Sequence, residues 1–189
     1  MRSPLHPNSI LVLKDLEPGF SAYSCPTSGG VWIPLQNYLD WQIRQPKPPM
    51  SVPAHPTPEL VDDSEQRALI CPESGRLLLR YRVGHGLQFH LDRSPATGGV
   101  WLGRGEWEAL KSKGLHTEMH LIFTAAYQRN IRSEQYGQRM EQTFRDRIGE
   151  PDFPRVVEIK KWLEAHPQRR EICCYLFNAI GSDDEQSSK

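Results

Sequence analysis

The sequence predicts a small α+β protein in which two similar β-hairpin units precede a helical region. The first observation is a repeat: Cys25-Pro-Thr-Ser-Gly-Gly-Val-Trp32 and Ser94-Pro-Ala-Thr-Gly-Gly-Val-Trp101 share five of eight residues at a constant offset. The second is a cluster of prolines between the repeats, and the third is helical periodicity from residue 117 onward. A repeated supersecondary unit of this kind indicates a duplicated fold.

These patterns divide the chain into five segments. They are a first copy (residues 1–44), a linker (45–64), a second copy (65–114), a helical region (115–181) and an acidic tail (182–189). Six prolines between residues 45 and 58 disfavour both helix and sheet, so the linker is expected to be extended. The tail is rich in Ser, Asp and Glu and is expected to be disordered.

Each copy is expected to contain a turn, a β-hairpin, a second turn and a short helix. His6-Pro-Asn-Ser9 before an apolar run matches Cys71-Pro-Glu-Ser74 before another, which aligns the first turns of the two copies. Glu17-Pro-Gly19 and Gly84-His-Gly86 supply the glycines that a tight reversal between strands requires. The short helices are expected at residues 35–42 and 104–111.

Three helices are expected after the second copy. The first is long and polar, covers residues 117–148 and ends before Gly149 and Pro151. The second covers residues 154–165, and we expect a buried stripe formed by Val156, Val157, Ile159, Trp162 and Leu163. The third covers residues 169–180 and is so apolar that it should be covered by another part of the protein. At least one of the three is expected to pack on the hairpin units.

Composition limits the cellular setting and the class of partner. With 38 % hydrophobic residues and 16 prolines in 189 residues, the chain predicts small cores rather than one large one. Lys plus Arg and Asp plus Glu both number 23, so no global positive field favours nucleic acid or membrane. We find no segment of membrane-spanning length, no signal peptide and no disulfide framework, and therefore expect a soluble, cytoplasmic protein with reduced thiols.

Residues 71–110 resemble the TFIIB-type zinc-ribbon family of bacterial proteins. The family pattern is Cys-Pro-x-Cys, a hairpin, then Cys-Pro-x-Cys-x-Gly-x-Trp-Leu-Asp-x-Gly-Glu-Leu. Here the second half reads Ser94-Pro-Ala-Thr-Gly-Gly-Val-Trp-Leu-Gly-Arg-Gly-Glu-Trp107, with Gly103 in place of the family's aspartate. The resemblance implies two small ribbon-like units, and it leaves the role of that aspartate without a counterpart in this chain.

Most of the metal ligands of the family are missing. Structural zinc needs four thiolate or imidazole donors, whereas the second copy offers only Cys71 beside Ser74, Ser94 and Thr97. In the first copy the aligned positions are His6, Ser9, Cys25 and Ser28. We therefore expect no metal and no cofactor, and name His6, Cys25 and Cys71 as residual metal candidates. Hydroxyl hydrogen bonds in the turns, and burial of Trp32 and Trp101 under the C-terminal helices, would replace the metal.

Two further groups have alternative interpretations. Cys173 and Cys174 could form a redox or metal pair, but their apolar helix favours core packing. His116 and His120 have the spacing of one helical turn, which could bind metal, yet the residue after the first histidine is Thr117 and not the glutamate of metalloproteases.

The function predicted from the sequence is that of a non-catalytic interaction, adaptor or assembly protein that binds another protein. Trp101, Trp107 and Tyr127 suit interface anchors and equally suit a core. Arg129 and Arg132 could contact phosphates in a nucleic-acid-associated factor, although interleaved acids are typical of a solvated face. A metal or redox protein is the other alternative. No nucleophile elbow or phosphate loop appears in the sequence, so we expect no enzyme.

Overall fold

The computed structural model describes residues 1–45 and 67–181, so residues 46–64 of the predicted linker and the tail lie outside the described residues. The chain divides into two compact units, Met1–Ser133 and Glu134–Lys189, which we call the sheet unit and the helical unit. The protein is α+β, as predicted, with an antiparallel sheet followed by helices.

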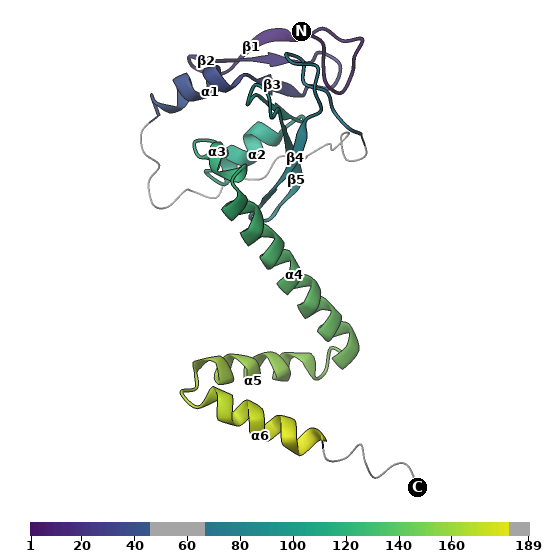
Figure 1. Cartoon of the computed structure of the whole chain (residues 1–189), viewed down its shortest axis with the longest axis vertical. Helices are drawn as coiled ribbons and strands as arrows, with labels where there is room; N and C mark the ends of the chain where they lie inside the picture. The colour runs from purple at the N-terminus through teal and green to yellow at the C-terminus, as the bar shows by residue number, and fades with distance from the viewer. Residues whose placement is uncertain (46–66, 182–189) are drawn as a thin grey trace. The chain divides into compact units, whose positions relative to one another are not determined.

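The sheet unit contains one six-stranded antiparallel sheet (Figure 1). Its strands are β1 Val12–Glu17, β2 Phe20–Ser24, β3 Val31–Ile33, β4 Leu79–Gly84, β5 Leu87–Arg93 and β6 Val100–Leu102. The spatial order is β1-β2-β3-β6-β5-β4. Each copy contributes three consecutive strands, β1 to β3 or β4 to β6. The first strand of each sheet half, β1 or β4, lies at an edge, and the third strands, β3 and β6, pair at the centre.

The central pair places the two repeated tryptophans opposite one another. Trp32 of β3 pairs with Trp101 of β6, and Val31 and Ile33 pair with Leu102 and Val100. The predicted hairpin turns are present, and Gly19 adopts the left-handed conformation with φ of 72°. The two predicted ribbon-like copies therefore share one sheet.

The helices are α1 Leu35–Gln42, α2 Glu106–Ser112, α3 Met119–Ile122, α4 Ala125–Ile148, α5 Phe153–Ala165 and α6 Arg169–Gly181. The long helix predicted at 117–148 is interrupted. Phe123 and Thr124 separate α3 from α4, and the Thr124 hydroxyl accepts a hydrogen bond from the Tyr127 N–H at 3.3 Å, as a helix-capping residue does. The helix predicted at 104–111 begins two residues later because Gly105 has a φ of 80°.

Two hydrophobic clusters cover the two faces of the sheet, because successive side chains of a strand point to opposite faces. Val31, Ile33, Val100 and Leu102 face one cluster, which the first helices complete with residues such as Trp41, Trp107 and Ile122. Trp32 and Trp101 face the other cluster. There they pack with Leu5, Leu11, Cys25, Leu69, Cys71 and Leu78. The expectation that C-terminal helices bury these two tryptophans is therefore wrong.

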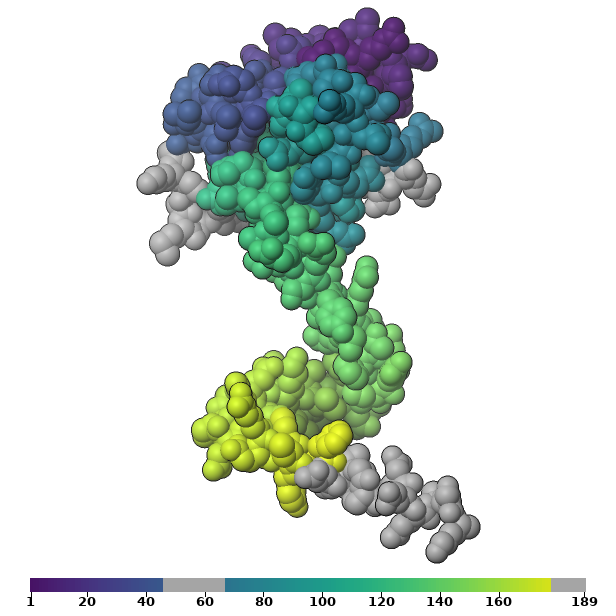
Figure 2. Space-filling view, viewed as in Figure 1, coloured from purple at the N-terminus to yellow at the C-terminus, as the bar shows by residue number. Residues whose placement is uncertain are grey.

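Polar contacts between the copies hold the sheet unit together. Figure 2 shows the purple-to-blue first copy packed against the teal second copy. The Trp107 Nε1–H of the second copy donates to Glu17 Oε1 of the first at 3.2 Å, and Lys111 pairs with the same carboxylate. The hydroxyl of Tyr38 donates to the His116 carbonyl at 3.1 Å.

The beginning of α4 packs on the β4–β5 hairpin, which confirms that a C-terminal helix returns to the sheet. The Tyr127 hydroxyl donates to the Val83 carbonyl at 2.6 Å, and Gln128 bonds to both the N–H and the carbonyl of Arg82. Ile131 is buried over Gly84, where an added Cβ would lie only 2.2 Å from Ile131 Cδ1.

The helical unit contains the rest of α4 with α5 and α6, which turns back beside α5 (Figure 1). Phe153 is buried, and the Arg145 guanidinium lies over its ring at 4.6 Å from the centroid. No helix in residues 1–45 and 67–181 combines the length and hydropathy that a membrane span requires.

Candidate functional site

Two turns in each copy carry an X-Pro-X-X pattern, and we call them knuckles. The first knuckle of the second copy is Cys71-Pro-Glu-Ser74, in which the Cys71 N–H donates to the Arg76 carbonyl at 2.8 Å next to the bridge Ile70↔Leu77. The matching bridge in the first copy is Arg2↔Ile10, with the Ser3 N–H donating to the Ser9 carbonyl at 2.9 Å.

The first knuckle of the first copy is therefore Ser3-Pro-Leu-His6, three residues earlier than the predicted His6-Pro-Asn-Ser9. Ser3 corresponds to Cys71, and His6 corresponds to Ser74. The amide bonds agree with this alignment, because the His6 N–H donates to Ser3 Oγ at 3.2 Å and the Ser74 N–H donates to Cys71 Sγ at 3.4 Å. The prediction failed because Pro4 and Pro7 both fit the pattern, and only strand pairing distinguishes them.

The second knuckles begin at Cys25 and Ser94, as the repeat predicts. The Cys25 N–H donates to the Gly30 carbonyl and the Ser94 N–H to the Gly99 carbonyl, both at 2.8 Å. Hydroxyls bond to turn amides here too, since the Thr97 N–H donates to Ser94 Oγ at 3.1 Å. The hydroxyl bonding expected in place of a metal is thus present.

Each copy holds one buried thiol among hydroxyl groups. Cys25 Sγ lies 3.5 Å from Ser9 Oγ. Burial alone would raise the pKa of Cys25, but hydrogen bonds from the hydroxyls of Ser28, Ser3 and Ser9 lower it to about 6. These donors favour the thiolate at neutral pH.

The second copy has the same arrangement around Cys71. Cys71 Sγ lies 3.8 Å from Thr97 Oγ1. Against burial, the hydroxyls of Ser74 and Ser94 lower the pKa of Cys71. Serine and threonine hydroxyls stay protonated at neutral pH and bind zinc poorly, so neither donor set fits the zinc that the ribbon resemblance implies.

The residual metal candidates are not gathered into one site. His6 and Cys25 belong to the first copy and Cys71 to the second. Throughout residues 1–45 and 67–181, no three His, Cys, Asp or Glu side chains are placed to hold a metal ion. His116 precedes α3, whereas His120 lies within it, so a helical turn does not bring the two imidazoles together.

The two tryptophans interlock the copies reciprocally. An added Cβ at Gly99 would lie 2.3 Å from Trp32 Cζ2, and one at Gly30 would lie 2.4 Å from Trp101 Cζ2. Each indole therefore occupies the space over a glycine of the other copy. The Trp32 Nε1–H donates to Glu73 Oε1 at 3.1 Å, whereas Leu5 stands at the corresponding place for Trp101. Within the described chain, Trp101 Nε1 is buried without a hydrogen-bond partner.

The predicted contact residues have different locations. Trp101 and Trp107 are 1 % and 4 % exposed, so they are core residues and not surface anchors. Tyr127 is half-buried, with its ring 5.6 Å from that of His85. Arg129 and Arg132 are exposed, and the Arg132 Nε–H donates to the Gln128 carbonyl of its own helix at 3.2 Å. Only the two arginines of this set present their side chains fully to solvent.

The buried carboxylates of the sheet unit have structural partners. Asp92 accepts a hydrogen bond from the Arg80 Nε–H at 3.0 Å. Glu106 accepts one from the Gly103 N–H at 2.7 Å, at the position where the family resemblance expects an aspartate. Both carboxylates therefore stabilise the fold.

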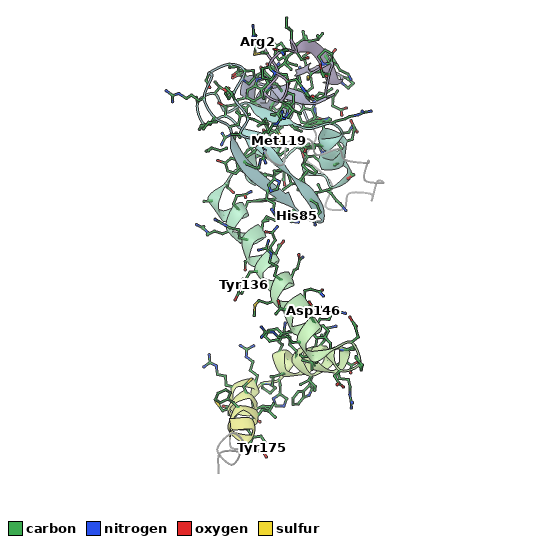
Figure 3. The ribbon with its side chains drawn as sticks, turned by 90° about the vertical axis from the view of Figure 1, so that its right-hand side faces the viewer. Arg2, His85, Met119, Tyr136, Asp146 and Tyr175 are labelled. Carbon is green, nitrogen blue, oxygen red and sulfur yellow. The ribbon has the colours of Figure 1, made fainter. Side chains whose placement is uncertain are left out.

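The helical unit exposes apolar side chains that the sequence analysis placed in a core. Val156, Ile159 and Trp162 are 40 %, 53 % and 54 % exposed, so the predicted buried stripe of α5 is half open to solvent. Cys173 and Cys174 are exposed as well, contrary to the expected core packing. Amphipathic spacing identifies an apolar face, but it does not identify what covers that face. Tyr136 and Tyr175, both strongly exposed, are labelled in Figure 3.

A groove runs between α4 and α5 in this unit. Its volume is about 640 Å³, and its walls include Gly137, Met140, Phe144, Ile148, Phe153 and Val156. Glu141 and Lys160 also line it. Sequence analysis missed this groove, although the four-residue spacing of Tyr136, Met140, Phe144 and Ile148 places them on one helix face.

Burial of His116 predicts a pH dependence of stability. Its ring packs against Trp41 and Trp107, with both centroids 5.9 Å away. Burial lowers the pKa of His116, Lys111 lowers it further, and Glu17 and Glu108 act in the opposite direction. As pH falls through about 6.5, the unfolded chain therefore gains a proton before the folded chain does, and the free energy of unfolding decreases until the folded-state pKa is passed.

We expect His116→Gln to flatten this decrease between neutral and mildly acidic pH. The measurement is urea unfolding followed by tryptophan fluorescence, compared as a slope against pH because the substitution also changes packing. His120→Gln, which removes an exposed imidazole, is the matched control. An unchanged slope in His116→Gln would assign the pH dependence to other groups.

No family model matches this chain, and no curated protein or solved structure matches it either.

Proposed function

We propose that this protein is a non-catalytic interaction or assembly factor, in which a metal-free pair of zinc-ribbon-like copies forms a rigid support and the helical unit binds another protein. One observation carries the proposal: large apolar side chains are exposed on α4, α5 and α6 together. They include Tyr136, Phe144, Ile159, Trp162, Tyr175 and Phe177. Apolar surface of this extent is typical of protein-binding sites.

The sheet unit also exposes apolar side chains beside the first knuckles, among them Ile10, Ile70 and Leu77, but within residues 1–45 and 67–133 no phenylalanine, tyrosine or tryptophan side chain is among the exposed ones. Cys25, Cys71, the tryptophans of this unit and the carboxylates of Asp92 and Glu106 are buried and hold the fold. A catalytic or metal-sensing role would require accessible ligands, whereas a supporting role requires only the shape.

The α5 face formed by Ile159 and Trp162 is the part we propose to test first. We expect the double substitution Ile159→Ser, Trp162→Ser to reduce recovery of a partner in a pull-down with the full chain by at least tenfold, because desolvated aromatic anchors dominate binding energy. The matched control is Glu158→Ser, Lys161→Ser, which changes two exposed polar residues of the same helix without changing net charge. Equal recovery in the two variants would remove the α5 face from the proposal.

A nucleic-acid-associated function is the second candidate. The exposed pair Arg129 and Arg132, three residues apart on α4, supports it. Against it, Arg145 is engaged by Glu150 at 3.4 Å, and the chain has no net charge. Nuclease treatment of half of the pull-down separates the candidates. Partners lost with nuclease, and lost in Arg129→Ser, Arg132→Ser, would favour nucleic acid.

A further inference from the structure

We propose that a second copy of this chain occupies the α4–α5 groove with its α6, so that two helical units form a symmetric dimer. This inference rests on the proposed function, because it identifies one partner of the apolar helical surface. Within one helical unit, the groove and one face of α6 are both exposed. The groove is concave, the face of α6 is convex, and the charged residues beside them have opposite signs.

The groove is apolar and open. Met140, Phe144, Ile148 and Val156 are between 36 % and 48 % exposed although they line it. Gly137 gives it room, because a Cβ there would meet no atom within 4 Å. Among the residues whose side chains the structure describes, none from the chain's own α6 lines the groove, which is therefore accessible to another molecule.

The occupant is suggested by a ridge on α6. Cys173, Leu176 and Phe177 have the i, i+3, i+4 spacing that places side chains on one helix face. All three are exposed, with Phe177 at 79 %. Ile172 is half-buried, and α6 contacts α5. The ridge can therefore enter a groove of another copy while α6 keeps its place on α5.

Charge favours the same pairing. Glu141 lines the groove and makes no ion pair within the described residues, whereas Lys160 already pairs with Glu164 at 3.9 Å. Arg169 and Arg170 open α6 and also lack an ion pair within the described part of the chain. The positive end of the helix dipole disfavours cations there, so an acid supplied from outside would stabilise them. Residues 134–181 hold equal numbers of acidic and basic residues, so two copies do not repel one another by net charge.

The contact is large enough for a weak dimer. Burying a phenylalanine ridge in an apolar groove removes roughly 300 Å² from each side, since one aromatic side chain alone contributes about 150–250 Å². A two-fold axis makes the contact twice, because each copy provides both groove and ridge. The total, on the order of 1,200 Å², lies at the lower end of specific interfaces, the size class of weak or transient association.

Sedimentation velocity and light scattering of the full chain test the proposal across the micromolar range. Reducing buffer is required, because the exposed Cys173 and Cys174 could otherwise link chains by a disulfide. We expect the mass to rise with concentration toward twice the 21.7 kDa of one chain. Phe177→Ser should weaken the dimer at least tenfold. Tyr175→Ser, which removes a ring that is 74 % exposed but lies off the ridge, should not.

A charge exchange adds a gain of function that unfolding cannot imitate. Glu141→Arg should weaken the dimer, and the further change Arg169→Glu, Arg170→Glu should restore it. A wild-type chain that stays monomeric, equal effects of Phe177→Ser and Tyr175→Ser, or no restoration would each overturn the dimer. The partner experiment on Ile159 and Trp162 uses a different face, so a monomeric chain that still captures its partner would reject the dimer alone.

Discussion

Replacing Ser3, His6 and Ser28 by cysteine is expected to create a site in the first copy that binds one zinc ion per chain. With Cys25 these three positions form the four corners of the two knuckles. The hydroxyls of Ser3 and Ser28 already hydrogen-bond to the Cys25 sulfur, so new thiolates would start within ligand distance of a shared metal. The triple variant therefore tests the proposed zinc-ribbon resemblance by restoring its chemistry.

The expected gain in stability is large. Structural zinc contributes about 10–16 kcal/mol of apparent binding free energy in small zinc-finger peptides. The sheet unit already folds without metal, so only part of this binding free energy would add to its stability. We expect the free energy of unfolding to increase by roughly several kcal/mol, and we expect a chelator to abolish the increase. Elemental analysis and thermal unfolding with and without chelator provide the measurement.

The control for the zinc experiment adds Cys25→Ser to the triple variant, which should lower zinc affinity strongly because a closed tetrahedral site then lacks one thiolate. If the purified triple variant contained no zinc and its stability did not change with chelator, the knuckles would lack the geometry of a zinc ribbon. The proposal of a metal-free ribbon pair would then lose its main support.

The repeat was the most informative part of the sequence. The constant offset between Cys25 and Ser94 predicted equivalent turns, and the pairing of Trp32 with Trp101 confirms that the two segments have equivalent places. What the repeat did not predict is that the copies share one sheet. Pairing between β3 and β6 joins residues that are far apart in the sequence, and local sequence patterns do not predict such contacts.

The misplaced first knuckle has a more local cause. Ser3-Pro-Leu-His6 and His6-Pro-Asn-Ser9 both precede the apolar run that begins at Ile10, and only the second ends in serine, as Cys71-Pro-Glu-Ser74 does. Backbone pairing between Arg2 and Ile10 decides the register. A register error of this kind changes the inferred ligand set, here by exchanging Ser9 for Ser3.

The prediction of Trp101 and Trp107 as surface anchors was wrong for a different physical reason. Trp101 and Trp107 suit an interface and a core equally, and burial depends on what the rest of the chain places around them. The converse error affected Ile159 and Trp162, which are exposed although their spacing is that of a buried stripe. Apolar residues at helical spacing mark one face of α5, but the spacing does not determine whether another part of the chain covers that face.

Gly99→Ala is expected to lower the free energy of unfolding of the sheet unit by about 1–3 kcal/mol, the usual cost of overpacking a core. The new methyl group would lie 2.3 Å from Trp32 Cζ2, closer than any tolerated contact. Trp32 is fully buried and cannot move aside without displacing the knuckle residues around it. Denaturant unfolding followed by circular dichroism measures the change.

A double-mutant cycle with Trp32→Phe assigns the cause. Phenylalanine has no counterpart of the outer indole ring that carries Cζ2. The Gly99→Ala methyl should therefore cost much less stability in the Trp32→Phe background than in the wild type. Trp32→Phe is itself destabilising, and the cycle corrects for this. Gly137→Ala gives the opposite reference. It lies in a helix with no atom within 4 Å of the added Cβ, and should stabilise that helix by about 0.5–1 kcal/mol.

If Gly99→Ala were equally costly with and without the indole, the clash with Trp32 would not be the cause, and the reciprocal interlock of the copies would have to be rejected. A strong coupling would instead mean that the glycine of each copy makes room for the tryptophan of the other, which gives the Gly-Gly-Val-Trp segment a structural role in both copies.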